Sequence, residues 1–309
     1  MSHITLLGPQ RYRPSIAQVL EELNLSGPLA VITAGWQERE SEVDELRRHV
    51  GRSVTNLQLH RRAETVFDRS PKVFQALRQR QQTLKRLQRL HRIRLDYALE
   101  PARKLLRRKG PPELLEPERE AAVAAVRELD AHHRRRLGEI HQEFEQEWGQ
   151  AMDRATRSQR QKIRKVVEES DAVAIAGGHV AVLLNRLRLF RLEEMMAGRP
   201  IVAWSAGAMA LTDSVVLFHD RPPQGAGNAE ILDLGLGLCS GVVVLPHASQ
   251  RLRLDDPVRV ALFARRFAPA RSVTLDPGAR LSWDGSSWTT GADTPLLAAD
   301  GSLETVESW

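Results

Sequence analysis

The sequence is poor in aromatic residues, has one cysteine and contains no long apolar run. Phe, Trp and Tyr together make up 5% of the 309 residues. No apolar stretch approaches the ~20 residues that a membrane-spanning helix needs, so we expect no membrane association. The opening residues, MSHITLLGPQRYRP, lack the basic segment and the long apolar stretch of a secretory signal.

Cys239 is the single cysteine, which excludes an internal disulfide and suits a reducing compartment. Its neighbours, LGLCSG, lack the surroundings of a cysteine nucleophile, so we expect a small buried apolar residue there. We therefore expect a cytoplasmic protein in which cysteine does no chemistry.

Positive charge is concentrated in one segment. The formal net charge is +6, but the stretch from Lys72 to Lys109 holds 13 Lys and Arg residues against two Asp and Glu residues. The following stretch, 111–169, is nearly balanced, with 11 basic and 13 acidic residues, and the rest of the chain is slightly acidic. The basic character is therefore local.

Residues 1–68 alternate between strand and helix patterns. The runs HITLLG, GPLAVITAG and SVTNLQLH predict three strands, and PSIAQVLEEL and ESEVDELRRHV predict the helices between them. Strands that alternate with helices favour a parallel sheet with helices on its faces. We expect the first part of an α/β domain here.

Residues 69–168 are different in kind, because they contain almost no glycine and no strand pattern. The sequence KGPPELLEP breaks this segment into two halves. The second half predicts one long helix with an apolar stripe, formed by Val126, Leu129, His133, Leu137, Ile140, Phe144, Trp148, Met152 and Ala155. The first half has a looser stripe, formed by Phe74, Leu77, Leu84, Leu87, Ile93, Leu95, Leu99 and Leu105. We expect an inserted, coiled-coil-like helical hairpin whose stripes face each other and whose acidic return arm partly pairs with the basic outgoing arm.

The α/β pattern resumes in residues 169–309. SDAVAIAGG, PIVAW, GVVVLPH and RSVTLDPG predict strands, and VAVLLNRLRLFRLEEMMAG predicts a helix. The C-terminal residues predict small antiparallel strands with turns at Asp284 and Asp300, each followed by glycine. The predicted fold is α/β: a doubly wound, mostly parallel sheet of flavodoxin-like type, interrupted after its third strand by the hairpin.

Polar residues and glycines follow the predicted strands of the second part. In a doubly wound sheet, ligands bind at the carboxyl ends of the strands. A serine hydroxyl becomes a nucleophile when a histidine accepts its proton and an acid holds the histidine, and backbone N–H groups stabilise the oxyanion. The residues at these strand ends supply all of these groups: Gly177-Gly178-His179, Ser205-Ala206-Gly207, Pro246-His247 and Asp276-Pro277-Gly278.

Four segments in this order resemble peptidase family S51: AIAGGHVAVLLNRL, PIVAWSAGAMAL, LPHASQRLR and VTLDPGARLSWDG. That family includes aspartyl dipeptidases and cyanophycinases, on a class I glutamine-amidotransferase-like fold. The resemblance covers about residues 1–65 and 170–300, and the hairpin has no counterpart in the family pattern. It implies a serine hydrolase that cleaves a small peptide or amide without a metal or an organic cofactor. A glutamine amidotransferase is disfavoured, because that chemistry uses cysteine where this chain has Ser205.

The resemblance also assigns roles by position. It makes Ser205 the nucleophile and His247 the base, and Gly178 and Ala206 the oxyanion hole. For Ser205 the competing interpretation is helix capping, and for His247 it is a buried histidine with its hydrogen bonds satisfied.

The acid is open between two aspartates. Asp276 lies where the family has a carboxylate near the next strand end, and Asp220 ends the run VVLFHD, where another family aspartate occurs. Asp276 also belongs to an ordinary Asp-Pro-Gly turn sequence, and Asp220 could be a simple loop aspartate. The resemblance ranks the two nearly equal.

The chain departs from the family pattern at three positions near the implied site. His179 replaces the Asn or Asp after the glycines, and Ala248 replaces the aromatic residue after the histidine. Asp256 stands where aspartyl dipeptidases have an arginine that binds the acidic side chain of the substrate. We expect Arg251, Arg253 and His179 to be the substrate-binding residues instead.

The hairpin invites other functions. His132, His133 and His141 could hold a metal, but no carboxylate-x-x-His pair accompanies them, so we expect solvated or core histidines. The basic arm lacks interleaved aromatics, which favours a solvated face, then a dimerisation or protein-binding arm, and nucleic acid last. The alternative function is a catalytically silent fold of the S51 type that acts as a binding or scaffold protein through this arm.

Overall fold

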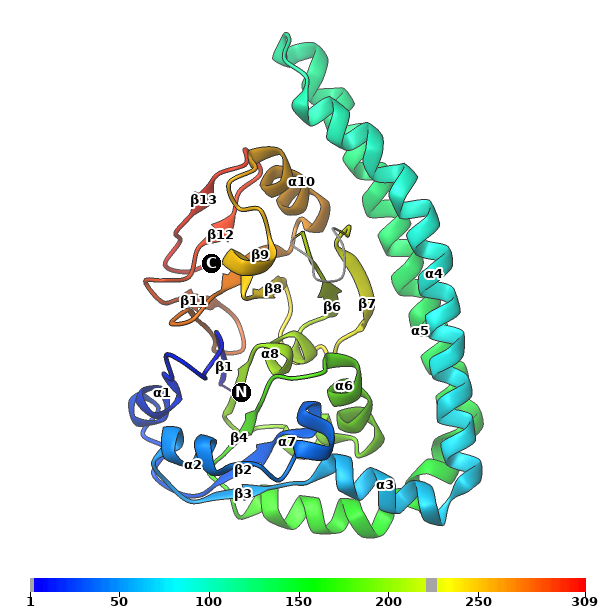
Figure 1. Cartoon of the computed structure of the whole chain (residues 1–309), viewed down its shortest axis with the longest axis vertical. Helices are drawn as coiled ribbons and strands as arrows, with labels where there is room; N and C mark the ends of the chain where they lie inside the picture. Colours follow the sequence, from blue (N-terminus) through cyan, green and yellow to red (C-terminus); the bar gives the residue numbers. More distant parts are fainter. Residues whose placement is uncertain (1–2, 221–226) are drawn as a thin grey trace.

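The computed structural model describes residues 3–220 and 227–309, and a seven-stranded sheet lies at its centre (Figure 1). Its strand order is β11-β10-β1-β5-β4-β2-β3, in which β1, β5, β4, β2 and β3 are parallel and β10 and β11 are antiparallel. Their bounds are β1 (Ile4–Leu7), β2 (Leu29–Ile32), β3 (Val54–Asn56), β4 (Ala172–Ile175), β5 (Ile201–Trp204), β10 (Arg280–Trp283) and β11 (Trp288–Thr290). Each residue of β1, β2, β4 and β5 is buried, which explains why these strands are almost continuously apolar.

Two smaller sheets complete the α/β part. The first has the order β13-β12-β9-β8, and the second is the antiparallel pair β6 and β7. Their bounds are β6 (Ser214–Leu217), β7 (Glu230–Leu234), β8 (Val242–Pro246), β9 (Arg271–Leu275), β12 (Leu296–Leu297) and β13 (Leu303–Glu304). The α/β class and the mostly parallel central sheet are confirmed. The parallel pair β8 and β9, however, belongs to a separate sheet, and the sequence did not predict the pair β6 and β7.

Short helices connect these strands. They are α1 (Ile16–Glu22), the 3-10 helix η1 (Ala34–Arg39), α2 (Asp44–Val50), α3 (Leu59–Arg69), α6 (Val180–Leu189), α7 (Leu192–Met196), α8 (Ala206–Leu211), α9 (Ala248–Arg251) and α10 (Pro257–Phe267). The predicted helix over 180–198 is divided between α6 and α7, because Arg191 adopts a left-handed backbone with φ 51°.

The third predicted strand is shorter than expected. It ends at Asn56, and helix α3 begins three residues later. The Glu40 carboxylate accepts hydrogen bonds from the backbone N–H groups of His60 and Arg61, at 2.9 and 3.0 Å. These bonds satisfy two N–H groups at the start of the helix. Helix α3 therefore starts where the side chain of Glu40, from an earlier part of the chain, binds its first N–H groups.

The inserted helical hairpin is confirmed, and it consists of α4 (Pro71–Arg107) and α5 (Pro112–Glu168). The two helices lie side by side along one edge of the molecule, and their tip projects beyond the α/β part (Figure 1). None of the helices in the described ranges is both long and apolar enough to cross a membrane.

The apolar side of the hairpin packs into the α/β part. Leu84 of α4 and Leu137, Phe144 and Met152 of α5 belong to the same buried cluster as the central strands. Nearer the tip, a separate cluster joins both arms to α10 through Leu95, Leu99, Val126 and Leu262, among others. The looser stripe is wrong at Ile93, which is 59% exposed. The hairpin is therefore part of the core along most of its length.

The expected charge pairing between the two arms is largely replaced by pairing with the α/β part. His91 and Asp130 form the ion pair between the arms in the described residues, at 3.3 Å. More of the hairpin's pairs run to the α/β part, as from Arg92 to Glu230 at 2.6 Å. The basic arm is therefore held against the domain by charge as well as by apolar contact.

Candidate active site

Ser205 lies on a tight elbow between β5 and α8. Its backbone has φ 52° and ψ −121°, a conformation that residues with a side chain rarely adopt. Its side chain makes no capping hydrogen bond, so the capping interpretation is wrong. The next residue, Ala206, is the first of α8, and the leading N–H groups of a helix lack an intrahelical acceptor. A side chain on Gly207 would collide with the carbonyl oxygen of Ile175, which explains the glycine in this turn.

A glycine turn after β4 approaches this elbow. A Cβ atom on Gly177 would lie 2.8 Å from the Cβ atom of Ser205. Gly178 has φ 115°, a conformation that favours glycine. The N–H group of His179 donates a hydrogen bond to the carbonyl oxygen of Gly35, at 2.8 Å. The turns after β2 and β4 therefore pack backbone to backbone beside Ser205.

His247 follows β8 and has a left-handed backbone with φ 58°. Its Nδ1 atom is buried and has no hydrogen-bond partner within residues 3–220 and 227–309, so the interpretation as a satisfied buried histidine is wrong. Burial lowers the pKa of His247, Arg251 lowers it further, and the charge of Asp276 partly opposes both effects. A lowered pKa keeps the imidazole neutral near pH 7, which is the form that accepts a proton.

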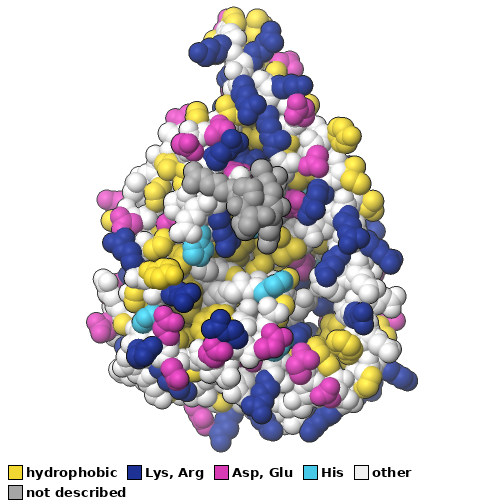
Figure 2. Space-filling model, in the orientation of Figure 1, with side chains coloured by type: hydrophobic (Ala, Val, Ile, Leu, Met, Phe, Trp, Pro, Cys, Tyr) yellow, Lys and Arg dark blue, Asp and Glu magenta, His cyan; other side chains and the backbone are white. Residues whose placement is uncertain are grey.

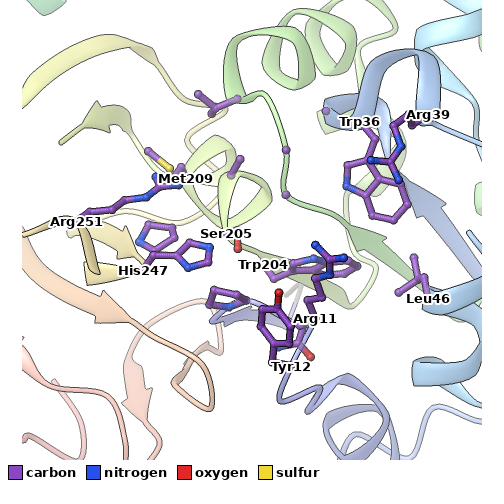
Figure 3. Close-up of a pocket in the computed structure, with 18 of the residues that line it drawn as sticks. Arg11, Tyr12, Trp36, Arg39, Leu46, Trp204, Ser205, Met209, His247 and Arg251 are labelled. Atoms are coloured by element: carbon purple, nitrogen blue, oxygen red, sulfur yellow. The ribbon is translucent and has the colours of Figure 1, made fainter. Parts of the chain in front are cut away.

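These residues line one cavity of about 680 Å³, within the usual size of a small-molecule site. Figure 3 shows His247 and Arg251 on one side of Ser205, and Trp36, Arg39 and Leu46 on the other. Figure 2 shows the corresponding face of the molecule, which is hollowed below the grey atoms, with apolar, basic and histidine side chains around the hollow. The predicted residues Ser205, Ala206, Gly178, His247 and Arg251 all line this cavity.

Several residues of the cavity were not predicted from the sequence. Gln10, Arg11 and Tyr12 follow β1, and Trp36 follows β2. They lie at the carboxyl ends of parallel strands, where ligands bind in such sheets. The same strand-end argument, applied to the first two strands, could have found them.

The two candidate acids differ in their contacts. The Asp276 carboxylate accepts hydrogen bonds from the N–H group of Ser249 at 3.1 Å and from its hydroxyl at 3.0 Å. The Asp220 carboxylate forms an ion pair with Arg259 and accepts a hydrogen bond from the N–H group of Arg253 at 3.1 Å. Only Asp276 is among the charges that raise the pKa of His247.

The remaining predicted substrate residues lie outside the catalytic cavity. His179 accepts a hydrogen bond from the N–H group of Val182, at 3.4 Å, and lines a neighbouring cavity. Arg253 lines a third cavity, and its guanidinium lies 3.6 Å from the carboxylate of Asp256. Asp256 itself caps α10, which explains an acidic residue at this position.

Two histidines of the return arm, His133 and His141, take part in packing and hydrogen bonds, and His132 is exposed. His133 stacks on His91 with ring centroids 4.0 Å apart, and His141 pairs with Asp233 at 2.7 Å. No group of three or more metal-ligating side chains occurs in the part of the chain that the structure describes. Cys239 is buried, and burial raises the pKa of its thiol.

A serine on a strand-to-helix elbow, beside a histidine at the end of a parallel sheet, is the arrangement of hydrolases with a nucleophile elbow. A model of peptidase family S51 matches residues 124–289, more than half of the chain, and the chain belongs to this family. The matched segment contains Ser205, His247, Asp220 and Asp276. The chain is therefore a peptidase.

The range of this match differs from the expected one. It begins inside α5 and so includes part of the hairpin, which the sequence comparison had left outside the family pattern. It omits residues 1–65, and α4 also lies outside it. The first three strands lie outside the match, and two of them pair with matched strands, β1 with β5 and β2 with β4.

Solved structures similar to the chain include two peptidases. A peptidase from an acI-B1 actinobacterium has 14% identity and a TM-score of 0.49, and the alignment covers 100% of this chain and 96% of that one. A putative peptidase E from Listeria monocytogenes EGD-e has 12% identity and a TM-score of 0.41, with 96% and 98% covered. No curated protein matches the chain.

Proposed function

We propose that this peptidase is a serine hydrolase that cleaves a small peptide or amide. The observation that supports the proposal is that one cavity is lined both by a strained Ser205 and by His247, whose buried Nδ1 atom has no hydrogen-bond partner among the described residues. In the first step the Ser205 oxygen attacks the carbonyl carbon while His247 accepts the hydroxyl proton. His247 then gives this proton to the departing amine, and water releases the acyl group from the serine.

The N–H groups of Gly178 and Ala206 would stabilise the oxyanion of the tetrahedral intermediate. Both residues line the cavity next to Ser205, and Ala206 begins a helix, where N–H groups are free to bind a ligand. The glycines at 35, 177 and 178 support this role, because a side chain on Gly177 would collide with Ser205, and side chains on Gly35 or Gly178 would push the two turns apart. Such donors act on the charge that develops in the transition state.

For the acid, the contacts favour Asp276 over Asp220. The negative charge of Asp276 raises the pKa of His247, as expected of the group that stabilises an imidazolium. The charge of Asp220 is already balanced by Arg259. Arg251 is the predicted substrate-binding residue that lines the catalytic cavity, and no metal or organic cofactor enters this mechanism.

The second candidate function is a binding or scaffold protein that docks through α4. The observation that favours it is an exposed apolar row on this helix, Leu90, Ile93 and Tyr97, at helical spacing and 62%, 59% and 79% exposed. A second copy of the chain or another protein would cover this row. The two functions do not exclude each other.

A hydrolysis screen over dipeptides, longer peptides, isopeptides and amides tests the proposal. We expect turnover by the parent chain and a loss of about 10³-fold or more in kcat for Ser205→Ala, with an unchanged melting temperature. Asp276→Asn should reduce kcat far more than Asp220→Asn. Turnover that survives in Ser205→Ala would contradict the serine mechanism, and a larger loss in Asp220→Asn would reassign the acid.

A further inference from the structure

The inserted helix α4 forms one wall of a second cavity, which adjoins the catalytic one. This cavity has a volume of about 780 Å³ and lies between α4, α6 and the strands β6 and β7. The residues that line both cavities are Gly178, Val180, Leu217, His219 and Arg251. The two cavities therefore meet beside the glycine turn and form one extended cleft.

Three polar residues of α4, together with Leu84, line this second cavity. Gln81, Lys85 and Gln88 are spaced by four and three positions, which places them on one face of the helix. Gln81 accepts a hydrogen bond from Asn185 at 3.1 Å, and Gln88 donates one to Glu230 at 3.3 Å. These two contacts fix the helix against α6 and β7, with Lys85 between them.

The charges in the second cavity are unbalanced toward the positive. Within residues 3–220 and 227–309, neither the Lys85 ammonium nor the Arg251 guanidinium pairs with a carboxylate. Burial lowers the pKa of Arg251, as expected of a cation without a counter-charge. The carboxylate that also lines the cavity, Asp233, is neutralised by Arg188 at 2.7 Å and is hydrogen-bonded to His141, also at 2.7 Å. Lys85 is exposed to solvent, whereas Arg251 is partly buried, so an anionic group would supply the counter-charge that Arg251 lacks.

The position of His247 indicates which part of a substrate reaches this cavity. The histidine that accepts the serine proton later gives it to the departing amine, so the leaving part of the substrate must pass beside it. His247 and Arg251 lie on the same side of Ser205 (Figure 3), and Arg251 also lines the second cavity. The cleft therefore continues from the leaving-group side of the catalytic serine toward α4.

We propose that the second cavity binds the leaving part of the substrate, and that Lys85 and Arg251 bind the free terminal carboxylate of a short peptide. The direction of the peptide in this proposal rests on the proposed serine mechanism. Lys85 is in this proposal a specificity residue that the inserted hairpin contributes to the site. The substrates are thus short peptides with a free carboxyl end, long enough to occupy both cavities.

Binding of tetra-alanine and of its C-terminal amide tests this proposal. The titrations use the full chain with Ser205→Ala, so that neither probe is hydrolysed, and isothermal calorimetry gives each dissociation constant. We expect the free acid to bind about three- to tenfold more tightly than the amide, the range for contacts between partly exposed charges. Adding Lys85→Gln to the Ser205→Ala chain should remove about half or more of the preference for the free acid over the amide.

Arg86→Gln is the matched control, because Arg86 is an exposed cation on the same helix that does not line the cavity. It removes the same charge and should leave the preference for the acid intact. Equal binding of acid and amide, no binding of either peptide, or an equal loss in Arg86→Gln would each overturn the proposal. A failure of this proposal can be told apart from a failure of the proposed function. Covalent labelling of Ser205 in the parent chain tests the serine mechanism, whether or not the chain prefers the free peptide acid over the peptide amide.

Discussion

The catalytic cavity and the ion pair between the hairpin and α10 differ in how far their polar groups are satisfied. At the hairpin contact, Arg266 and Asp130 are both 4% exposed, and the guanidinium donates two hydrogen bonds to the carboxylate, at 2.6 and 2.8 Å. In the cavity, the Nδ1 atom of His247 is buried and has no hydrogen-bond partner among the described residues, and Ser205 has a strained backbone. Buried polar groups are normally paired. Other described side chains, among them His91 and His133 of the hairpin, also have unpartnered buried nitrogens, but His247 lines the cavity that contains the strained serine.

The difference also separates stability from function. The paired groups at the hairpin contact hold an inserted segment onto the domain, and a change there leaves a buried charge alone. The strained and unpartnered groups of the cavity contribute little to stability, since strain at a functional site is a cost that the rest of the fold offsets. Substitutions in the two regions should therefore have opposite signatures.

The largest effect on stability is expected at the hairpin contact. Asp130→Asn leaves Arg266 buried without its counter-charge and should lower the free energy of unfolding by about 3–5 kcal/mol, measured by urea unfolding. The matched control is Glu116→Gln, which breaks the partly exposed pair between α5 and the neighbouring Arg265 and should cost about 0–1 kcal/mol. Equal losses in the two variants would contradict the distinction between the paired buried contact and the surface.

The next largest effect is expected on activity. In Gly177→Ala the new methyl group meets the Cβ atom of Ser205, which lies 2.8 Å away, and a shift of about 1 Å in a nucleophile costs on the order of 10²-fold in rate. Gly51→Ala is the control, because φ is 68° there but no atom lies within 4 Å. It should cost about 1 kcal/mol of stability and no activity. A Gly177→Ala variant with full kcat would show that the elbow does not need this close approach.

A smaller effect concerns the pH dependence of stability. Burial, and then the neighbouring His91, lower the pKa of His133 to about 4. The folded state therefore favours the neutral ring, so its contribution is fully present above about pH 6.5 and is lost as the pH falls toward 4. His133→Gln removes this titration, and it should flatten the fall in unfolding free energy between pH 7 and pH 5. A fall as steep as in the parent chain would assign the acid sensitivity to other groups.

The smallest effect is a shift in the pH profile of kcat/KM. Hydrolysis needs neutral His247, so the rate should rise with pH through the lowered pKa of this residue. Arg251→Gln removes a cation that lowers this pKa and should move the acid limb to higher pH. Asp276→Asn removes the opposing charge and should move it to lower pH. If the acid limb of the kcat/KM profile moves in neither variant, a group other than His247 controls that limb.

The sequence predicted the features that depend on neighbouring residues. Apolar runs predicted the buried strands, and two amphipathic segments separated by Gly110 and two prolines predicted the hairpin. The position of Ser205 between a predicted strand and small residues predicted the turn that contains it. Each of these follows from local pattern, and the structure has them in the expected order.

What the sequence could not show depends on partners far along the chain. The start of α3 depends on Glu40, and the partners of Asp130 come from α4 and α10, at positions that no local pattern connects. Tyr12 and Trp36 join the cavity only because β1 pairs with β5 and β2 pairs with β4 in the folded sheet. Contacts such as these are set by packing, and so they appear only in the folded chain.

The reactivity of Ser205 is the central claim, and labelling with diisopropyl fluorophosphate followed by peptide mapping tests it most directly. Ser249 is an internal control, because it is an exposed serine on the same rim, hydrogen-bonded to Asp276. The serine mechanism predicts one adduct per chain, on Ser205 and not on Ser249, and much slower labelling in His247→Ala. A chain that carries no adduct on Ser205, or that is labelled equally on both serines, would contradict it.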